Sequence, residues 1–543
     1  MIDKYSKNQK ENKIESQLGF QFLKNNSIIT LTIIGVIGLI IRLYYFPFNI
    51  PITYDSIDYF SYAVVVSQQG QLPNGWGLTN NGWPVFLSIF FSIFNSQNFL
   101  ELTYIQRFLT VIISVLTIIP VYLLCSRFVK KQFAIIGAAL FVLEPRIIIN
   151  SLLGIPESGF ILLGTLSLFF FLSKRFTLIS ISFVLLALST IIRYEGFLIL
   201  IPFLVIFFFR FRKDGKVLKK LFFLSVIFIL SISPMAFATY DAIGNDGIIS
   251  PIFGGGITYF STYIIGGIPD LDDPIYGENV EQNRFSLFVT LGAINLIKFL
   301  GWVLVPTFVL FAIIGFFLLF QNRDYKIITI LAYGLTMLIP AFYAYGRGIE
   351  ETRYLYILFP IFCIMSSLAI RKIFEKFKRE NLILVLIISG ILISSITFLE
   401  YKKIDYQYEA ESYLIAKEID NIASGINHWQ QWKYIPIAQI DNDWPNIPLP
   451  KETNYNQSFE MKRSDARNYQ TLIEYLMDSK NKGLTHLVVD GKTQPEFLNY
   501  IFYHEEEFPY LIKKIDSIDR EFEYKVKVFK IDYEKFLKKY IEN

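Results

Sequence analysis

Charged side chains gather at the ends of the apolar segments of this sequence, where they could form a polar site. Asp55 and Asp58 follow the first long apolar segment. A short helix over 55–69 would place both carboxylates on one helical face, because they are three residues apart. The other interpretation is that both are solvated loop acids or caps of a helix N-terminus.

Further carboxylates and guanidiniums lie at the ends of later apolar segments. A charge at membrane depth costs about 2.5–3.5 kcal/mol on insertion, so charged residues at such positions mark function by default. The set comprises Glu144, Arg146, Glu157, Arg193, Glu195, Arg347, Glu350, Glu351 and Arg353. In the orientation argued below they share one face with Asp55 and Asp58, which predicts a polar cavity with acids and arginines side by side.

The composition indicates a membrane protein. The chain has 543 residues, of which 53% are hydrophobic and 18% charged, and a soluble domain carries about 25% charged residues. A soluble multidomain enzyme and a disordered chain are therefore excluded. The net charge of +4 and the lack of a long basic tract argue against a nucleic-acid partner. Two cysteines in apolar runs and three late histidines predict no metal site among those residue types.

Eleven apolar runs are long enough to be membrane spans. They fall near 27–46, 104–125, 132–150, 157–173, 176–192, 196–210, 218–238, 299–320, 327–345, 354–370 and 382–400. The run 83–95, GWPVFLSIFFSIF, is too short to span and is interpreted as a helix in the membrane interface.

Basic residues set the orientation of these spans. With a cytoplasmic N-terminus, every short basic cluster falls on the cytoplasmic side, whereas 47–106 on the other side has no Lys or Arg. The prediction is a polytopic α-helical protein of the cell membrane. Its parts are a cytoplasmic tail 1–26, a transmembrane domain 27–400 with external loops 47–103 and 241–298, and an extracytoplasmic domain 401–543.

The C-terminal region has a different composition and predicts a small α/β domain. Strand-like runs occur at 434–440, 485–490 and 524–533, and a helical pattern occurs at 466–480. His486 is interpreted as a structural residue at the start of a strand. The acidic run DLDD at 270–273 offers oxygen ligands for a divalent cation, but a solvated loop is the favoured interpretation, so no cofactor is predicted.

The order of motifs resembles the GT-C superfamily of polyprenyl-phosphate-sugar-dependent glycosyltransferases. The likeness is greatest to its family-39 group, which includes protein O-mannosyltransferases and lipid A aminoarabinose transferases. The first external motif is carried by Asp55-Ser56, Tyr59, Ala63, Gly70 and Trp83-Pro84. Later motifs are GIPESG with Glu157, RYEG with Arg193, and TRYLYILFP with Arg353, Tyr354 and Pro360. Ser56 departs from the pattern, because many relatives have Glu there.

The resemblance implies a glycosyltransferase of the GT-C fold that acts at the extracytoplasmic face. The implied donor is a sugar on polyprenyl or dolichyl phosphate, and the acceptor hydroxyl belongs to a protein, a lipid or a polysaccharide. Asp55 is then the candidate base, with Asp58 as its possible substitute, and Glu157 would contact substrate or orient the aspartate. Arg193, Arg347 and Arg353 would bind the lipid phosphate, unless they pair with Glu195, Glu350 and Glu351.

Two other functions remain open from the sequence. A transporter or flippase for lipid-linked sugars is the main alternative, although no internal repeat is visible. A scaffold protein is the third, although it would not require converging acids and arginines.

Overall fold

The computed structural model describes residues 27–53, 55–268, 270, 275–276, 283–321, 324–374, 380–402, 406–444, 461–493 and 495–540. The expected N-terminal tail 1–26 and residues 271–273 of the DLDD run lie outside this set. The chain forms two compact units, which we call the helical unit and the mixed unit. The helical unit comprises the described residues of 1–46, 77–87 and 106–403, and the mixed unit those of 47–76, 88–105 and 404–543.

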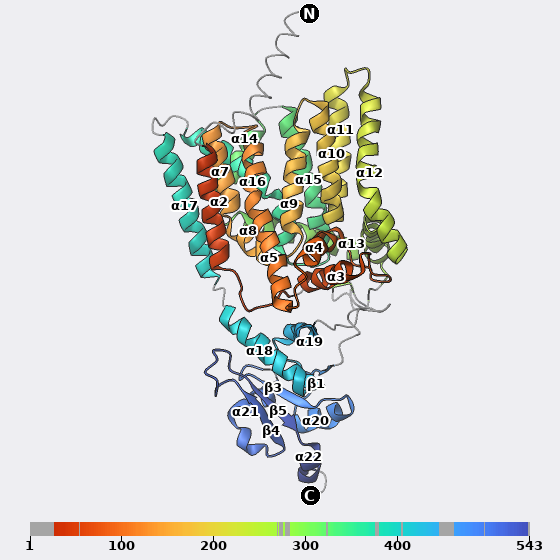
Figure 1. Cartoon of the computed structure of the whole chain (residues 1–543), viewed down its shortest axis with the longest axis vertical. Coiled ribbons are helices and arrows are strands. Elements are labelled where there is room, and N and C mark those ends of the chain that lie inside the picture. The colour runs from red at the N-terminus through yellow and green to blue at the C-terminus, as the bar shows by residue number, and fades with distance from the viewer. Residues whose placement is uncertain are drawn as a thin grey trace, which may run out of the picture. The chain divides into compact units, whose positions relative to one another are not determined.

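Apolar helices build the helical unit, and most of the long ones lie roughly alongside one another (Figure 1). The first nine, in chain order, are α2 (Ser27–Tyr44), α4 (Gly82–Phe94), α5 (Phe99–Leu116), α6 (Ile118–Cys125), α7 (Lys131–Val142), α8 (Pro145–Ser151), α9 (Glu157–Phe171), α10 (Phe176–Ile192) and α11 (Leu200–Phe211). The remaining helices are α12 (Val217–Ile243), α13 (Arg284–Leu304), α14 (Val309–Leu319), α15 (Tyr325–Gly346), α16 (Phe359–Phe374) and α17 (Glu380–Tyr401). Helices α4 and α5 each continue into the mixed unit.

The expected number of eleven spans is not confirmed. Within the described residues, eight helices are long and apolar enough to cross a membrane, or nine if the bent pair α7 and α8 is one span. The bend between α7 and α8 is 51° and falls at Pro145, which cannot continue the hydrogen-bond ladder. Three expected spans correspond to the shorter helices α9, α10 and α14.

The expected span 299–320 and the expected loop 241–298 are both wrong in detail. The helix α13 begins at Arg284 and ends at Leu304, and α14 begins only at Val309. Pro306 interrupts the helix because it lacks an N–H and clashes with the preceding turn.

The helix α13 crosses the end of α15. Along α13, Phe288 packs against Phe342, Phe299 packs against Tyr345, and Lys298 pairs with Glu350 at 3.1 Å. Its contacts therefore stay near the C-terminal end of α15 over its whole length. At the start of α15, Lys326 Nζ donates to the Arg127 carbonyl at 3.5 Å, beside the basic connection that precedes α7.

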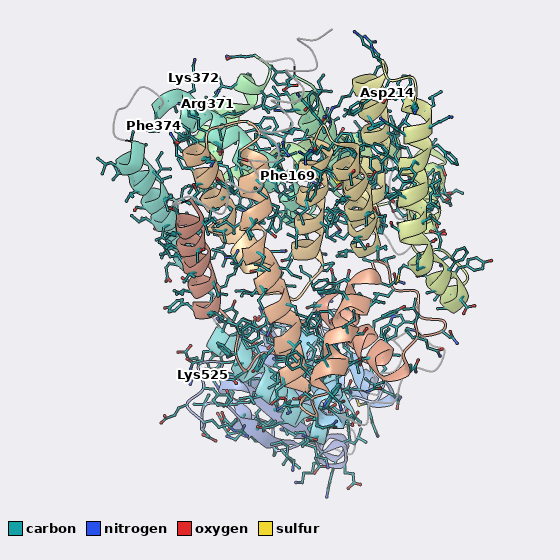
Figure 2. The ribbon with its side chains drawn as sticks, turned by 45° about the horizontal axis from the view of Figure 1, so that its top comes forward. Phe169, Asp214, Arg371, Lys372, Phe374 and Lys525 are labelled. Carbon is teal, nitrogen blue, oxygen red and sulfur yellow. The ribbon has the colours of Figure 1, made fainter. Side chains whose placement is uncertain are left out.

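The basic connections between helices lie at one end of the helical unit, as predicted. Arg210 donates to the Phe171 carbonyl at 2.9 Å, and Arg371 donates to the Phe128 carbonyl at 3.2 Å. Figure 2 shows Asp214, Arg371 and Lys372 at this end. The predicted segregation of charge is confirmed, while the side of the membrane that this end faces remains a prediction.

The mixed unit joins a helix from residues 47–76 to an α/β sheet. The predicted helix over 55–69 is confirmed as α3 (Asp55–Gln69). The other helices are α18 (Tyr406–Ile422), α19 (Ile435–Asp443), α20 (Leu472–Asn481), α21 (Glu496–Tyr503) and α22 (Tyr533–Tyr540). The strands are β1 (Gly425–Asn427), β2 (Lys462–Ser464), β3 (His486–Val489), β4 (Leu511–Asp516) and β5 (Lys527–Ile531).

The five strands form one sheet with the order β2-β1-β3-β5-β4. Strand β1 is parallel to both β2 and β3, whereas β5 is antiparallel to β3 and β4. Strands β3 and β5 confirm the predicted strands at 485–490 and 524–533. His486 begins β3 and is 4% exposed, in agreement with its predicted structural role.

The predicted strand at 434–440 is wrong, because these residues form most of α19. Pro436 lies in the first turn, where proline favours a helix start. The buried residues Ile435 and Ala438, and likewise Ile437 and Ile440, are three apart, so the same apolar pattern also suits one helical face. The predicted helix at 466–480 begins later, at Leu472, after the Thr471 cap.

Trp444, which follows α19, joins the sheet-containing region to residues of α3 and of the start of α5. Its ring lies 6.0 Å from the ring of Phe60 on α3 and 6.0 Å from the ring of Phe99 at the start of α5. Phe60 and Phe99 are fully buried, and the centres of their rings are 5.2 Å apart. Residues far apart in the sequence therefore share one core in the mixed unit.

Candidate functional site

A buried arginine flanked by two carboxylates is the centre of the polar site in the helical unit. Arg193 lies in extended backbone directly after α10 and before the 3₁₀-helix Tyr194–Ile199. Its guanidinium contacts Glu157 at 2.5 Å and Glu195 at 2.6 Å. The side chains of Arg193 and Glu157 are only 12% and 4% exposed. Since two carboxylates face one guanidinium, the group has a net charge of −1.

Glu157 has one oxygen that is available for a further contact. Its Oε1 accepts from Arg193, whereas its buried Oε2 has no hydrogen-bond partner among the described residues. A buried carboxylate oxygen in this state is a strong acceptor for an incoming hydroxyl group. The alternative structural role of Glu157, at the N-terminus of α9, does not use this second oxygen.

The segment 77–87 packs directly against the site. Gly82 approaches α10 so closely that an added Cβ would lie 2.4 Å from the carbonyl oxygen of Ile191. Trp83 is fully buried and donates through Nε1 to the Gly154 carbonyl at 3.2 Å. Asn80 accepts from the backbone N–H of Tyr194 at 3.1 Å. The turn before α4 therefore positions the backbone on both sides of Arg193.

A cavity of about 740 Å³ lies beside this cluster within the helical unit. Its lining includes Glu195, Tyr194 and Tyr354 from the cluster and Arg347 from the end of α15. Further lining comes from 77–79, from the C-terminal part of α15 and from the stretch 243–260, which contains Gly254, Gly255 and Gly256. A cavity of this volume is large enough for a small-molecule substrate.

Arg347 lies over an aromatic ring at the cavity. Its guanidinium carbon is 4.0 Å from the centre of the Tyr259 ring and 5.9 Å from that of Tyr343. An arginine stacked in this way is held by the face of the ring. The N–H groups at the edge of its guanidinium point away from the ring and suit contacts with a ligand. This geometry suits the binding of an oxyanion in the cavity.

A second, much smaller space of about 20 Å³ adjoins the first and shares Glu195, Pro340 and Tyr354 with it. Glu157, Arg193 and Arg353 also line this space, so three of the predicted site residues meet there. Arg353 forms an ion pair with Glu351. The volume corresponds to about one water molecule, so this space is a polar recess of the main cavity.

The two predicted acids belong to the mixed unit. Asp55 is exposed and Asp58 is partly buried, at the start of α3. Burial, and secondly the nearby charge of Asp55, raises the pKa of Asp58 to about 6. The arginines and Glu157 belong to the helical unit, so the convergence of the two sets remains a prediction from the sequence.

The predicted internal pair of Glu144 and Arg146 is confirmed. Both are buried, and Arg146 Nη1 lies 3.3 Å from Glu144 Oε1. Thr307 also donates to Glu144, and Arg146 donates to the Val305 carbonyl. These contacts tie α8 to the interruption between α13 and α14, so the pair has a structural role.

Sequence reasoning missed Tyr259 and Tyr343, which flank Arg347. The glycine run 254–256 before Tyr259 lines the cavity, but its sequence does not indicate that an arginine lies against the following tyrosine. Asn80 was also missed, although it has a φ of +60°, which asparagine tolerates better than most residues.

Within the described ranges, one group of side chains has the geometry to hold a metal ion. It consists of His504, Glu506 and Glu507 in the mixed unit. These residues are close in sequence and largely exposed, which is common for acidic surface groups without an ion. They support no cofactor assignment.

Comparisons with known proteins place these features in a known fold. No family model and no curated protein sequence matches this chain. Among solved structures, the archaeal oligosaccharyltransferase AglB from Archaeoglobus fulgidus, in complex with an inhibitory peptide and a dolichol-phosphate, has a TM-score of 0.55 and 14% identity. The match covers 91% of this chain and 73% of that chain.

A second similar structure is ArnT from Cupriavidus metallidurans bound to undecaprenyl phosphate. It has a TM-score of 0.52 and 9% identity, and the match covers 93% of this chain and 97% of that chain. Both proteins are membrane glycosyltransferases of the GT-C superfamily. The chain has the GT-C fold, and the resemblance seen in the sequence is confirmed at the level of the fold.

Proposed function

We propose that this protein is an inverting glycosyltransferase that uses a sugar linked to polyprenyl or dolichyl phosphate. The observation that carries the proposal is the cavity of about 740 Å³ beside Arg347, Glu195 and Tyr354 in a chain of GT-C fold. AglB was solved with a dolichol-phosphate and ArnT with undecaprenyl phosphate, so two proteins of this fold bind polyprenyl phosphates.

Arg347 is our principal candidate for binding the donor phosphate. It lines the main cavity, and its stacking on Tyr259 holds the guanidinium in one plane. A positioned cation stabilises the charge that develops on the leaving phosphate. Arg353 is a second candidate, whereas Arg193 is already held by Glu157 and Glu195 and is better suited to orienting them.

Glu157 is the candidate for recognising the sugar. Its buried Oε2 can accept from a sugar hydroxyl while Oε1 remains paired with Arg193. Asp55 is the candidate base, because it is exposed at the start of α3 and a base must reach the acceptor hydroxyl.

The reaction requires one bond to form as another breaks. The acceptor oxygen attacks the anomeric carbon, and the bond from that carbon to the phosphate oxygen breaks. The electron pair leaves with the polyprenyl phosphate, and the hydroxyl proton goes to Asp55. A single displacement inverts the anomeric centre without a covalent sugar-enzyme intermediate.

The proposed setting is the extracytoplasmic face of the cell membrane. The site then lies at the end of the helical unit opposite the basic connections, in accord with the positive-inside rule. The acceptor is a hydroxyl of a protein, a lipid or a polysaccharide.

The test is sugar transfer by purified Asp55→Asn protein. Asparagine keeps the size of aspartate but cannot accept the proton, so transfer from radiolabelled polyprenyl-phosphate sugars to extracted membranes should fall by at least about 10²-fold. Donor binding should be retained, because the proposed phosphate ligands are unchanged. Asp58→Asn is the matched control and should have a smaller effect.

Two outcomes would refute parts of this proposal. If Asp58→Asn abolishes transfer and Asp55→Asn is mild, the base has been assigned to the wrong aspartate. If the parent protein moves lipid-linked sugars across vesicle bilayers without transferring label, the flippase function replaces the transferase.

A further inference from the structure

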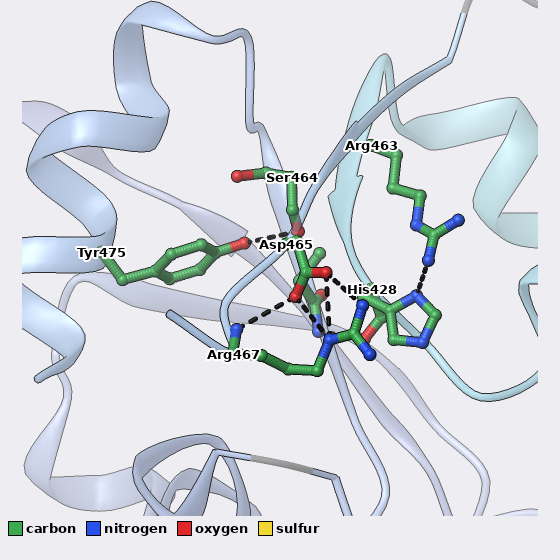
Figure 3. A network of polar contacts seen from close by, with 7 residues as sticks. His428, Arg463, Ser464, Asp465, Arg467 and Tyr475 are labelled. Atoms are coloured by element: carbon green, nitrogen blue, oxygen red, sulfur yellow. Dashed lines mark hydrogen bonds and ion pairs between the residues drawn. The ribbon is translucent and has the colours of Figure 1, made fainter. Parts of the chain in front are cut away.

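A cluster of cationic and imidazole side chains lies at one edge of the sheet in the mixed unit. His428 directly follows β1, whereas Arg463 lies on the edge strand β2 and Arg467 follows that strand. The parallel pairing of β1 with β2 brings these positions together. The backbone N–H of His428 donates to the Ser464 carbonyl at 2.9 Å. Figure 3 shows both arginines reaching toward the His428 ring.

The contact between Arg463 and His428 fixes the proton on the imidazole. Arg463 Nη2 bonds to His428 Nδ1, and a guanidinium can only donate. His428 Nδ1 is therefore the acceptor, and the ring proton lies on Nε2, which becomes a donor. Arg463 and His428 together offer only donors to any further partner.

The charge of this cluster is positive. Arg467 is held by Asp465, with Nη2 to Oδ2 at 2.5 Å and Nε 3.0 Å from both carboxylate oxygens. Arg463 is exposed and lies 5.6 Å from the Trp432 ring. Among the residues that the structure describes, no carboxylate pairs with Arg463. Two arginines and one aspartate thus leave a charge of +1 around a neutral imidazole.

The location in the sheet is one that α/β proteins use for binding. Ligands of such sheets bind outside the carboxyl ends of parallel strands, near the point where the strand order reverses. His428 follows the carboxyl end of β1, and Asp465 follows that of β2. In the order β2-β1-β3 the chain passes from β1 to β2 and then back across β1 to β3, so the reversal is at β1.

We propose that Arg463, His428 and Arg467 form a binding site for a phosphate or sulfate group. The guanidinium of Arg463 supplies the charge, the Nε2–H of His428 supplies a neutral donor, and Arg467 adds donors that Asp465 does not occupy. Arginine clusters of this kind bind tetrahedral oxyanions through charge-assisted hydrogen bonds. This site lies in the mixed unit and does not depend on the proposed transferase reaction.

The ionisation of His428 provides a signal for occupation of the site. Burial, and then the positive charges of Arg463 and Arg467, lower the pKa of His428, while Asp465 opposes them. A bound anion adds negative charge and should raise the pKa again. The other two histidines, His486 and His504, serve as internal references in the same protein.

The experiment uses the full chain, labelled at histidine, in nanodiscs of zwitterionic lipid. Inorganic phosphate is titrated while the ring signals of the histidines are followed by NMR as a function of pH. We expect phosphate to raise the pKa of His428 by at least about half a unit, with no comparable change at His486. The affinity for phosphate, measured by calorimetry, should be at least about tenfold weaker in Arg463→Gln.

Lys462→Gln is the matched control. Lys462 precedes Arg463 on the same strand and is also exposed, but its side chain lies against Gly483, on the other face. Both variants lose one positive charge, so general attraction of phosphate would weaken equally in both. Equal weakening, or no selective change at His428, would overturn the proposal.

Two further probes distinguish between two sources of the anion. A pKa rise with glucose 6-phosphate in zwitterionic nanodiscs would indicate a phosphorylated saccharide. A rise that requires phosphatidic acid in the nanodisc would indicate a lipid headgroup. Failure of both probes and of inorganic phosphate would refute the site.

Discussion

Arg193 and Arg347 differ in what surrounds their guanidiniums, although both were predicted phosphate ligands. Arg193 lies between Glu157 and Glu195, and all three side chains are largely buried. Arg347 lies against Tyr259 and faces the main cavity. These surroundings are the reason that we propose a structural role for Arg193 and donor binding for Arg347.

Lysine substitutions should separate these two roles. Lysine keeps the charge but cannot bridge two carboxylates with a planar fork. We expect Arg193→Lys to lower the melting temperature and to reduce kcat. Arg347→Lys should leave the melting temperature nearly unchanged and weaken donor binding by about 10-fold or more.

Thermal unfolding and donor-binding titration in the same detergent measure both effects. Lys298→Gln is a suitable control, because Lys298 pairs with Glu350 in an exposed position. Such exposed pairs contribute about 0–1 kcal/mol. A reversed pattern, with Arg347→Lys unfolding early and Arg193→Lys impairing only donor binding, would contradict the assignment.

The pH dependence of sugar transfer should reflect the protonation state of Asp58. Its pKa of about 6 lies above the ordinary value of 3.8, because burial and Asp55 disfavour its charged form. As the pH falls through 6, Asp58 gains a proton, and the negative charge next to the proposed base Asp55 is lost. We expect transfer to decline below pH 6 in the parent protein.

Asp58→Asn should remove that decline, because asparagine does not titrate. It should also stabilise the fold at pH 7 by about 1–2 kcal/mol, since a raised carboxyl pKa destabilises the folded state above that pKa. An unchanged acid limb in Asp58→Asn would show that another group controls the rate. Unfolding at pH 7 and at pH 4 measures the stability difference, which should vanish at the lower pH.

The sequence predicted which residues share one end of the helices, but it did not predict their pairing. Helix ends follow from apolar length, so Glu157 and Arg193 could be assigned to one end without a structure. Their ion pair depends on how α9 and α10 pack, because the two residues are 36 positions apart. Composition does not encode that packing, so Glu195 alone was expected as a partner of Arg193.

At the scale of elements, the turn before α4 and the first residue of that helix, Gly82, hold the site by close packing against α10. A Cβ at Gly82 would lie 2.3 Å from Ile191 Cγ2 and 2.4 Å from its carbonyl oxygen. We expect Gly82→Ala to displace this turn from α10 and to reduce transfer about tenfold or more, since small displacements near a site impair positioning.

Gly77→Ala is the control, because an added Cβ there meets no atom within 4 Å although Gly77 lines the cavity. Transfer assays on both variants at equal folded concentration measure the difference. Normal transfer in Gly82→Ala would show that the close approach is not needed for activity.

The helices and strands were predicted best where the residue pattern fitted only one type of secondary structure. The short apolar run 83–95 and the helix 55–69 appear as α4 and α3 almost residue for residue. The residues 434–440 fit either a strand or a helix face, and Pro436 favoured the helix. The interruption at Pro306 was hidden because apolar residues continue on both sides of it.

At the scale of the whole molecule, the segregated basic residues predict the orientation. The basic residues that the structure describes between the helices lie at one end of the helical unit, and by the positive-inside rule we expect that end to face the cytoplasm. A reporter inserted after residue 214 should be active in the cytoplasm, and one fused after residue 402 should be active only outside. The opposite result would place the cavity on the cytoplasmic side and exclude an extracytoplasmic transferase.

The packing of Trp444 against Phe60 and Phe99 has a consequence for biosynthesis. The ribosome makes α3 early, yet the Trp444 ring that packs against Phe60 is made 384 residues later. During translation the acidic helix therefore lacks this support. A chain that ends before Trp444 lacks this ring, so we expect the packing of α3 around Phe60 to be weaker than in the full chain.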